Sequence, residues 1–588
     1  MKLYKLSLAL FLGFGAMSMT SCEDKLEVTN PNEQTTGTFG FTSDDLEECV
    51  IAAYHDLRME GSTGRVGYTI DAVRGDEVWN ASQVWYMPFD DMNDPVTDGI
   101  SFWPWREYYY AINVCNFILS RTTGDNAQLS ESMKRIKGQA LFIRGFAYYN
   151  LVGYYKDVPL ITDYSTYSSL DGLYGANNTS DEVLDQAEKD LKEAMELLPN
   201  RQAGGEWSKG RATCGAAAGY YARTLMFRHK YSEALDVLKD IIGGTKYGKY
   251  KLMANYGDNF REGSAYENND ESLFEVQYLD YGTQGVDDEW TPVNVSPNAT
   301  QGHAVESNFA PGDFGGWADL SASPWLYNLF KEERTTAGKL DPRLYWTLGT
   351  YEKEWEGFEN GNVAYTKKIT ATDTLRTNNN YGGIPIAKWT NMRTGLYSSV
   401  ATGLRCGINL RMMRYSDVLL RAAECENEVN GPTEQAIKWI NEVRQRAGLA
   451  DLKLEDFNTK DKLFEQIANV ERPKEFGCEN GRGMDLIRWG FFYDNGRLDQ
   501  LKEHGTFYKS KTIDVKTPVT YAQTKTDPEH VKSSYDTYLP GHEFLPIFQT
   551  LLNNNPNLKG NSANDGIDNS TDFFGRGWTV HPVVDLSK

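Results

Sequence analysis

The sequence predicts a mainly α-helical fold, a scaffold of helical hairpins that carries a large loop-rich excursion with few short strands. Apolar residues recur at spacings of three and four across about 43–243 and 411–494, the period of a helix with one buried face. Gly, Asn, Asp, Tyr and Trp are frequent in about 244–410 and 495–588, where that period is rare. The 588 residues are 40% hydrophobic and 13% aromatic, enough apolar side chain for a large core.

A signal peptide and a lipidation site are predicted at the N-terminus. Lys2 and Lys5 precede an apolar run, residues 6–16, that is too short to span a membrane. The following Met19-Thr20-Ser21-Cys22 resembles the lipobox of bacterial lipoproteins, in which cleavage leaves the cysteine as a lipidated first residue. We therefore expect residues 1–21 to be removed and Cys22 to carry the anchor. The alternative is an ordinary signal peptide with an incidental cysteine.

The mature chain is expected to consist of a flexible N-terminal tether followed by one folded domain. Residues 22–42 are polar and rich in Thr, Asn and Gly, typical of a flexible spacer, and residues 43–588 form the domain. Glu23-Asp24 resembles the acidic tag that directs some lipoproteins to the outer face of a Gram-negative outer membrane. No other stretch approaches the roughly 18 consecutive apolar residues of a membrane span. These features predict a lipid-anchored protein that faces the cell exterior.

Six helices are predicted in the first part of the scaffold. Ser43 is the expected cap of the first, and Pro104 suits the first turn of the second. Ser180 is the expected N-cap of the fourth helix, and Pro199 stops it. After the helix that Ser43 begins, the others are expected near residues 103–120, 130–155, 180–198, 211–229 and 231–243.

The helices appear in pairs. A helix rich in small residues precedes a partner with one apolar face in residues 211–243, and again in residues 411–448. Residues 130–198 hold a looser pair. This pattern favours tetratricopeptide-type packing with unevenly spaced units, and a plain helical bundle is the alternative. Small residues that would let helix backbones approach closely are Gly219, Ala222, Ala422 and Ala423.

Charge and cysteine usage exclude some classes of partner. The chain has 60 Lys and Arg against 82 Asp and Glu, a net charge of −22. Such a chain is poorly suited to gripping nucleic acid or anionic lipid, although a local basic patch is compatible with it. The seven cysteines form no CxxC pair and lie at no metal-ligand spacing from a histidine, so we expect neither zinc nor a disulfide scaffold. Four of them fall in helical patterns beside apolar residues and are expected to be buried free thiols: Cys49, Cys115, Cys214 and Cys425.

No catalytic motif organises the ionisable residues. The patterns GxSxG, HExxH and GxxxxGK[ST] are absent, and Asp76-Glu77 and Glu471 have no arrangement that marks the carboxylate pair of a glycosidase. Four aspartates in one loop could hold Ca²⁺ but lack the order and the glycine of an EF-hand: Asp90, Asp91, Asp94 and Asp98. We expect no enzymatic activity, no cofactor and no metal.

Aromatic residues on polar loops form the candidate ligand site. Trp79-Asn80 and Trp85-Tyr86 stand between two predicted helices, and Tyr278, Tyr281, Trp290 and Trp317 lie in the excursion. A sugar covers a flat ring with its C–H face while its hydroxyls take directional hydrogen bonds. The alternative is that the rings plug the underside of the loops. The predicted site consists of Trp79, Trp85, Tyr86 and Trp290, assisted by Asn80 and Asp76.

Three stretches resemble motifs of the SusD/RagB-like outer-membrane lipoproteins. Residues 138–151, continuing to Asp157-Val158-Pro159-Leu160, are similar to the family's helix that ends in a "gD-V-P-L" turn. Residues 440–448 (INEVRQRAG) are similar to "iN-x-vR-x-R-A-G", and residues 471–490 to "ER-x-x-E-l … eG-x-R-x-x-D-L-x-R-W-G". Leu545-Pro546-Ile547 and residues 555–558 resemble the family's C-terminal part, although Ile547-Phe548 and Cys478-Glu479-Asn480-Gly481 depart from its usual pattern.

The charged residues of these motifs are predicted to be scaffold rather than a catalytic site. We expect five arginines to face carboxylates such as Glu471, Glu475 and Asp485 in a buried or half-buried network. The five are Arg444, Arg446, Arg472, Arg482 and Arg488.

The resemblance implies a non-enzymatic surface protein that caps a TonB-dependent outer-membrane barrel of the SusC type. Members bind oligosaccharides and act as a lid that closes on the barrel. The helical-repeat face would contact the barrel, and the excursion would carry the glycan site. A peptide-binding lid of the RagB kind is the first alternative, and a lipid-anchored glycosidase the second. Reducing-end release from polysaccharides separates the second from the other two.

Overall fold

The computed structural model describes residues 42–168, 174–279, 302–350, 352–355, 383–393, 406–479, 481–509 and 517–588, together with Gly40 and Gly172. Within these ranges the fold is mainly helical with few short strands, as predicted. Cys22, the signal peptide and Trp290 lie outside the described residues, as do Tyr281 and most of the predicted tether.

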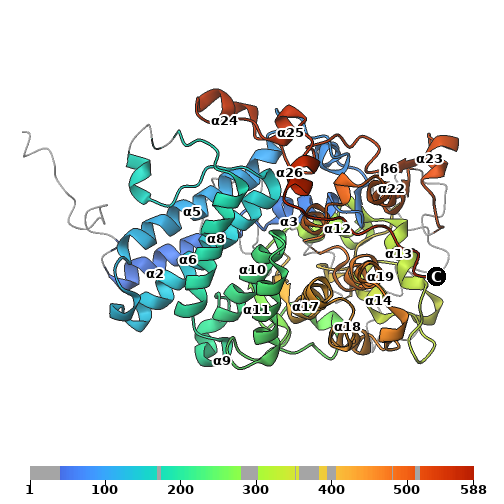
Figure 1. The fold of residues 1–588 in the computed structure, drawn as a ribbon, viewed down its shortest axis with the longest axis horizontal. Helices are drawn as coiled ribbons and strands as arrows, with labels where there is room; N and C mark the ends of the chain where they lie inside the picture. The colour runs from blue at the N-terminus through green and yellow to red at the C-terminus, as the bar shows by residue number, and fades with distance from the viewer. Residues whose placement is uncertain are drawn as a thin grey trace, which may run out of the picture.

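Eight long helices form the scaffold, and each packs on the next in chain order (Figure 1). The contact between α11 and α17 joins residues 231–243 to residues 415–430, so the two predicted parts of the scaffold are continuous in space. The hairpins α10–α11 and α17–α18 confirm the predicted pairs. The scaffold helices are α2 (Ser43–Leu57), α5 (Trp103–Arg121), α6 (Glu131–Tyr155), α8 (Ser180–Leu197), α10 (Cys214–Phe227), α11 (Tyr231–Gly243), α17 (Tyr415–Asn430) and α18 (Glu434–Arg446).

Two predicted helix caps are displaced by one residue. Thr42, not Ser43, caps α2, and its hydroxyl accepts from the backbone N–H of Asp45 while the Asp45 carboxylate accepts from the Thr42 N–H. Thr179, not Ser180, forms the same capping box with Glu182 at the start of α8. Thr42 and Thr179 are the caps because an acidic residue follows each of them three positions later. The carboxylate of that residue accepts a hydrogen bond from the backbone N–H of the capping threonine.

Close helix packing comes partly from residues that the sequence did not single out. A Cβ on Gly145 of α6 would lie 2.8 Å from Leu191 Cγ of α8, so this glycine lets the two helices approach. Gly219 was predicted to serve helix packing, but its Cβ would lie 2.5 Å from Met413 Sδ, which belongs to a strand. Ala222, Ala422 and Ala423 are fully buried, as their predicted role requires.

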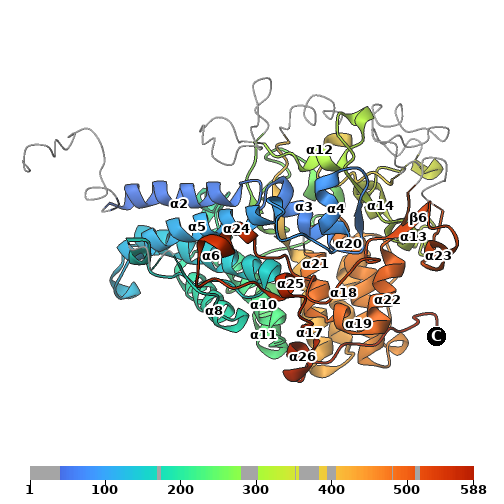
Figure 2. The ribbon, with the colours of Figure 1, turned by 90° about the horizontal axis from the view of Figure 1, so that it is seen from above.

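Several short helices lie on one side of the scaffold, and three two-stranded antiparallel ladders occur among the described residues. In Figure 2, α3, α4, α12 and α14 lie on the opposite side of the molecule from α8, α11 and α19. In the described ranges the ladders pair β1 (Val78–Asn80) with β3 (Leu320–Ala322), β2 (Ser272–Val276) with β4 (Leu410–Arg414), and β5 (Thr506–Tyr508) with β6 (Val531–Ser533). The remaining α-helices are α3 (Arg65–Val73), α4 (Met87–Asp90), α9 (Arg201–Gly204), α12 (Val305–Phe309), α13 (Pro324–Lys331), α14 (Pro342–Thr347), α19 (Lys460–Gln466), α20 (Arg472–Phe476), α21 (Arg482–Arg488), α22 (Asn495–His504), α23 (Ala522–Thr526), α24 (Gln549–Asn554), α25 (Ser562–Asp565) and α26 (Ser570–Gly575).

Tighter turns connect these elements, and one wider, π-helical turn, η12 (Ile467–Glu471), leads into α20. The 3₁₀ turns are η2 (Val84–Tyr86), η3 (Ile100–Phe102), η4 (Asn126–Gln128), η5 (Tyr164–Ser168), η6 (Gly205–Ser208), η7 (Tyr256–Phe260), η8 (Gly312–Phe314), η9 (Lys353–Trp355), η10 (Asn391–Arg393), η11 (Leu454–Asp456) and η13 (Phe491–Tyr493).

One large apolar cluster runs from α2 through the scaffold to the β2–β4 ladder. Cys49, Cys115, Cys214 and Cys425 are buried free thiols, as expected, and so are Cys406 and Cys478. Within the described ranges, no helix is both long enough and apolar enough to cross a bilayer.

Candidate functional site

The loop that carries the first predicted aromatic group is fixed by Asn80 and Asp90. The Asn80 side-chain oxygen accepts from the backbone N–H of Gln83 at 3.0 Å, and its amide nitrogen donates to the Gln83 carbonyl at 2.7 Å. The backbone N–H of Asn80 donates to Asp90 Oδ2 at 3.0 Å. Asn80, predicted as a ligand contact, is therefore occupied in holding the turn that presents Trp85.

Trp85 is the predicted ring that reaches the surface. It is half-buried on η2, between Val84, whose exposed fraction is 77%, and Met87, whose exposed fraction is 42%. Its ring centroid lies 3.7 Å from that of Tyr86, at an interplanar angle of 29°. The guanidinium of Arg65 lies 5.3 Å from the Trp85 ring centroid, close enough for a cation–π contact.

A second half-buried indole, Trp317, lies close to Trp85. It follows η8, and its backbone N–H donates to the carbonyl of Ser307 at 2.6 Å. The same Arg65 guanidinium lies 5.5 Å from the Trp317 ring centroid. The structure thus brings together one ring from each of the two predicted aromatic groups, joined by an arginine.

Three of the predicted site residues are buried beneath this surface. Trp79 is 3% exposed and stacks on Phe507 with 4.0 Å between ring centroids. Tyr86 is fully buried, and its hydroxyl lies 2.5 Å from the Thr69 hydroxyl. These rings support the loop and offer no free face to a ligand. They occupy the underside of the loop, the alternative position that the sequence left open.

Asp76 is the third buried residue. Its carboxylate accepts from Arg482 Nε at 2.7 Å and lies 2.8 Å from His504 Nδ1. Burial alone would raise its pKa, but Arg482 and His504 together hold the pKa below its usual range. Asp76 is therefore an ionised partner inside the scaffold.

Sequence reasoning missed Arg65 and Glu60. Arg65 is the first residue of α3 and Glu60 lies in the preceding turn, and both side chains are almost fully buried as an ion pair. No local pattern distinguishes this arginine from a surface one, because its partners come from residues 84–86 and 317 as well as from Glu60.

The aspartates of the predicted Ca²⁺ alternative point to different partners. Asp94 pairs with Arg74 at 2.8 Å, and Asp98 accepts from the Ile100 N–H at 2.9 Å. Burial raises the pKa of Asp90 and of Asp94 to about 7. Among the described residues, no group of three or more His, Cys, Asp or Glu side chains converges as metal ligands would.

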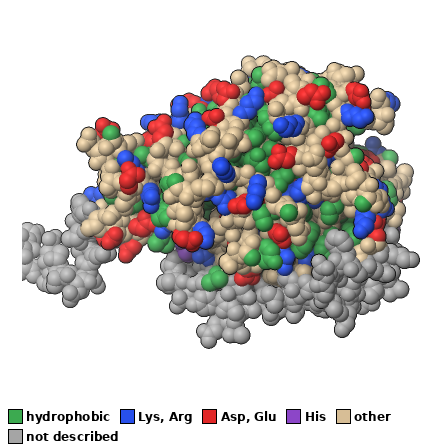
Figure 3. Space-filling model, turned by 90° about the horizontal axis from the view of Figure 1, so that it is seen from below, with side chains coloured by type: hydrophobic (Ala, Val, Ile, Leu, Met, Phe, Trp, Pro, Cys, Tyr) green, Lys and Arg blue, Asp and Glu red, His purple; other side chains and the backbone are tan. Residues whose placement is uncertain are grey.

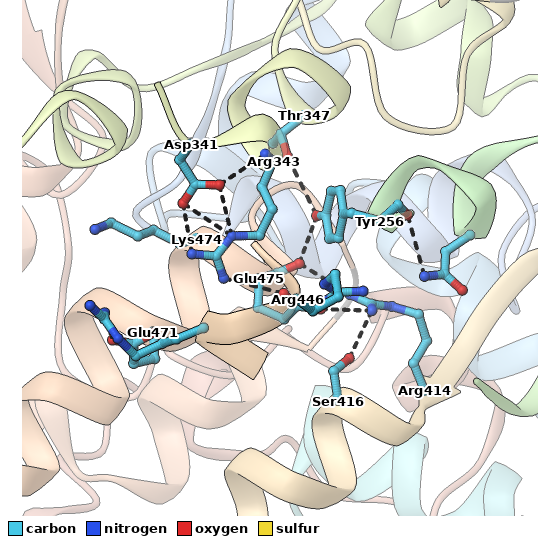
Figure 4. A network of polar contacts seen from close by, with 12 residues as sticks. Tyr256, Asp341, Arg343, Thr347, Arg414, Ser416, Arg446, Glu471, Lys474 and Glu475 are labelled. Carbon is cyan, nitrogen blue, oxygen red and sulfur yellow. Dashed lines mark hydrogen bonds and ion pairs between the residues drawn. The ribbon is translucent and has the colours of Figure 1, made fainter. Parts of the chain in front are cut away.

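Glu475 and Arg446 of the motifs lie in a buried network, as predicted, and the structure adds Arg343 and Arg414, which the sequence analysis did not name (Figure 4). Glu475 lies at its centre and accepts from Arg414 at 2.9 Å, from Arg343 at 3.3 Å and from Arg446. Burial raises the pKa of Glu475, but the three guanidinium groups outweigh it and hold that pKa well below its usual range. Tyr256 donates to the Glu475 carbonyl at 2.8 Å.

The rest of the predicted network is also confirmed. The expected carboxylate partners occur as Arg444–Glu471, Arg472–Asp485 and Arg488–Asp485, while Arg482 pairs with Asp76. The network connects α17, η12, α20 and α21 to the ladders. Its residues do not include the half-buried indoles Trp85 and Trp317. Buried pairs with this many partners indicate structure rather than ligand turnover.

Two polar hollows lie on other parts of the surface. One, of about 680 Å³, runs along α18 beside residues 451–455 and is lined by Lys438, Asn441 and Glu442. The other, of about 310 Å³, lies between α9 and β2, where Tyr250 and Arg201 line it. On the face in Figure 3, acidic and basic side chains are interspersed rather than gathered by sign.

Comparison with known proteins identifies the family. A sequence model described as "SusD family" matches residues 270–565, half of the chain. The chain belongs to the SusD family. A second model, described as "Starch-binding associating with outer membrane", matches residues 24–226. The two matches cover most of the helical scaffold and most of the excursion, in agreement with the resemblance of the motifs.

Curated relatives of this SusD-family protein span nearly its whole length. SusD-like protein P25 of Formosa agariphila is 26% identical over 530 residues, which are 84% of this chain and 91% of the relative. SusD-like protein P2 of the same organism is 24% identical over 506 residues, 83% of this chain and 91% of the relative.

Solved structures share the fold. A SusD superfamily protein from Bacteroides vulgatus has a TM-score of 0.69 and 24% identity, covering 90% of this chain and 100% of its own. Surface glycan-binding protein A from Bacteroides thetaiotaomicron, solved in complex with laminarihexaose, has a TM-score of 0.63 and 22% identity, covering 88% of this chain and 99% of its own.

Proposed function

We propose that this SusD-family protein is a cell-surface glycan-binding lipoprotein that captures oligosaccharides and serves as the lid of a SusC-like TonB-dependent outer-membrane transporter. The observation that carries the glycan site is Trp85, a half-buried indole on a hydrogen-bonded turn with an exposed apolar residue before it and another two positions after it. The fold supports the proposal, because a protein of this fold was solved with laminarihexaose bound.

The surface around Trp85 has the chemistry that a neutral sugar requires. The indole and its exposed neighbours Val84 and Met87 supply apolar area for the C–H face of a sugar ring. The neighbouring Ser82 and Gln83 are partly exposed and uncharged, and the Ser82 hydroxyl donates to Asp319. Trp317 extends the apolar area, whereas the buried Trp79 and Tyr86 support the loop from beneath.

Trp85→Ala is expected to weaken oligosaccharide binding about tenfold. A stacked sugar hides on the order of 60 Å² of apolar surface, worth about 1.5 kcal/mol, which is close to one decade in Kd. Calorimetric titration with laminarihexaose and with maltohexaose measures the change beside the wild type. Trp207→Ala is the matched control, since this half-buried indole packs between Arg135 and Arg211 outside the site.

A thermal melt of the same variant separates the platform from a core residue. Truncating a fully buried indole costs about 3–5 kcal/mol of stability, whereas a platform ring costs much less. Unchanged affinity together with a collapsed melting temperature would assign Trp85 to the core and remove it from the site.

Chemical tests separate glycan capture from the two alternatives. Incubation with polysaccharides is expected to release no new reducing ends, because the protein captures the ligand without cutting it. A peptide library is expected to compete only weakly with oligosaccharides, because the site presents two indoles rather than a row of backbone donors and acceptors. Tight binding of peptides with no binding of either hexasaccharide would favour the RagB-type lid.

Cys22→Ala is expected to leave the protein without its anchor, because only the thiol of that residue accepts the lipid. The variant should move from the membrane fraction of cells to the soluble fraction, while the secreted body keeps the melting temperature of the wild type. Ser21→Ala is a matched control that retains the thiol and the small residue at the cleavage site. Persistence of the alanine variant at position 22 in a detergent-extractable form would contradict the lipobox.

The wild-type protein is expected to co-purify with a large TonB-dependent barrel from detergent-solubilised outer membrane, because a lid must bind the barrel that it closes. Identification of the captured protein by mass spectrometry measures this. The Trp85→Ala variant is the control that should still capture the barrel. Repeated recovery of the lipoprotein without any barrel would count against the lid.

A further inference from the structure

We propose that Arg65 is a positioning residue that holds Trp85 and Trp317 as one two-ring platform, a role that rests on the proposed glycan-binding function. The two indoles come from separate parts of the chain, η2 and the segment after η8. Arg65 lies within cation–π range of both.

The contact distances limit the size of the platform. The guanidinium carbon of Arg65 lies 5.3 Å from the Trp85 centroid and 5.5 Å from the Trp317 centroid, so the rings are no more than about 11 Å apart. At this upper limit a short oligosaccharide covers both rings and a single pyranose does not. The dependence of affinity on chain length therefore measures how far apart the two rings lie.

Arg65 is itself held firmly. Its Nε donates to Glu60 Oε1 at 2.7 Å, and a second hydrogen bond of the guanidinium reaches the same oxygen. The side chains of both residues are 1% exposed. The hydroxyl of Thr69 donates to the Arg65 carbonyl at 2.6 Å, which ties the arginine to the next turn of α3.

The ion pair also sets the charge that a ligand meets. The Glu60 carboxylate neutralises the guanidinium of Arg65. The arginine therefore contacts the two indoles as half of an ion pair, and a bound ligand does not meet an unpaired positive charge. The fully buried Asp319 lies close by, where the Ser82 hydroxyl donates to it at 2.9 Å. This arrangement fits a neutral oligosaccharide better than one that carries uronate or sulfate groups, because the described cation at the two rings, Arg65, is already paired with Glu60.

The first test needs no ligand. The protein is labelled with 5-fluorotryptophan, and the ¹⁹F resonances of Trp85 and Trp317 are assigned from Trp85→Phe and Trp317→Phe. Arg65→Met is expected to shift both resonances, because both rings lose the guanidinium. Arg135→Met is the matched control, since it removes the arginine over Trp207 and should shift that resonance alone. A spectrum in which Arg65→Met moves neither ring, or only one, would overturn the proposal.

The second test uses chain length, a readout that a purely structural role would not change. Laminaribiose to laminarihexaose and maltose to maltohexaose are titrated into wild type and Arg65→Met. The wild type should gain affinity once a chain reaches both rings, and the variant should keep its disaccharide affinity while binding the hexasaccharide about tenfold more weakly. An equal loss at every length would contradict the platform.

A second variant covers the case in which Arg65→Met does not fold. Arg65→Lys keeps a cation beside Glu60 but lacks the planar guanidinium, so it should retain the fold and lose about threefold in hexasaccharide affinity. Wild-type affinity in this lysine variant would overturn the role of the guanidinium. If the wild type binds none of these saccharides, the proposed function fails, and the ¹⁹F spectra still decide whether Arg65 positions the two rings.

Discussion

Glu475→Gln is expected to lower the free energy of unfolding by about 3–5 kcal/mol, the cost of removing one partner from a buried ion pair. The glutamine keeps the shape of the side chain but leaves Arg343, Arg414 and Arg446 without the carboxylate they share. Urea unfolding followed by tryptophan fluorescence measures the difference. The loss should appear in the midpoint with little change in the slope.

The matched control for this substitution is Glu455→Gln. Glu455 pairs with Lys453 at 3.4 Å, and both side chains are more than 70% exposed. Exposed pairs contribute about 0–1 kcal/mol, so the control should unfold close to the wild-type midpoint. Equal effects of the two substitutions would show that the network around Glu475 does not hold the scaffold together.

The stability of the protein is expected to fall as the pH rises from about 5 to about 9, with Glu77 as a main cause. Burial raises the pKa of Glu77 to about 8, and the neighbouring Asp76 charge adds to the shift while Arg482 opposes it. The folded state then holds this proton more tightly than the unfolded state does. Its contribution is complete below the unfolded pKa of about 4.5 and is lost as the pH rises through about 8, a change of ~5 kcal/mol.

Glu77→Gln tests this pH dependence. In the wild type the backbone N–H of Cys478 donates to the Glu77 carboxylate at 3.2 Å, and the amide oxygen of glutamine can accept the same hydrogen bond. The substitution therefore removes only the ionisation. The free energy of unfolding is measured at pH 5, 7 and 9 for both proteins. The value for Glu77→Gln should be similar to that of the wild type at pH 5 and higher than that of the wild type at pH 9. The variant should keep a shallower slope, because burial also raises the pKa of Glu306 to about 7. Parallel profiles for the two proteins would contradict the assignment to Glu77.

The helical scaffold could be predicted because its signals are local. The helix expected at residues 231–243 occurs as Tyr231–Gly243, and apolar spacing alone defines it. The caps were displaced by one residue, since Thr42 and Thr179 are distinguished from the following serines only by the acidic residue that completes the box. The arginine network could be predicted from the motifs because each charged side chain in a buried element needs a partner.

The candidate site could be predicted only in part, because burial of a ring depends on distant segments. Trp79 and Trp85 stand six positions apart on similar polar sequence, yet Trp79 is covered by Phe507 from β5 while Trp85 is half-exposed. Arg65 carries no local sign of its role, since the rings it contacts belong to residues 85 and 317. Trp290 lies outside the described residues and stays a prediction.

A crystal structure of the protein with laminarihexaose or maltohexaose, whichever binds more tightly by calorimetry, tests the central claim most directly. The account predicts sugar rings against the exposed part of Trp85 and reaching Trp317, with the Arg65 guanidinium still in contact with both indoles. Intact glycosidic bonds are expected in the bound chain. An oligosaccharide bound instead in the hollow beside Tyr250 or along α18, with Trp85 uncovered, would contradict it.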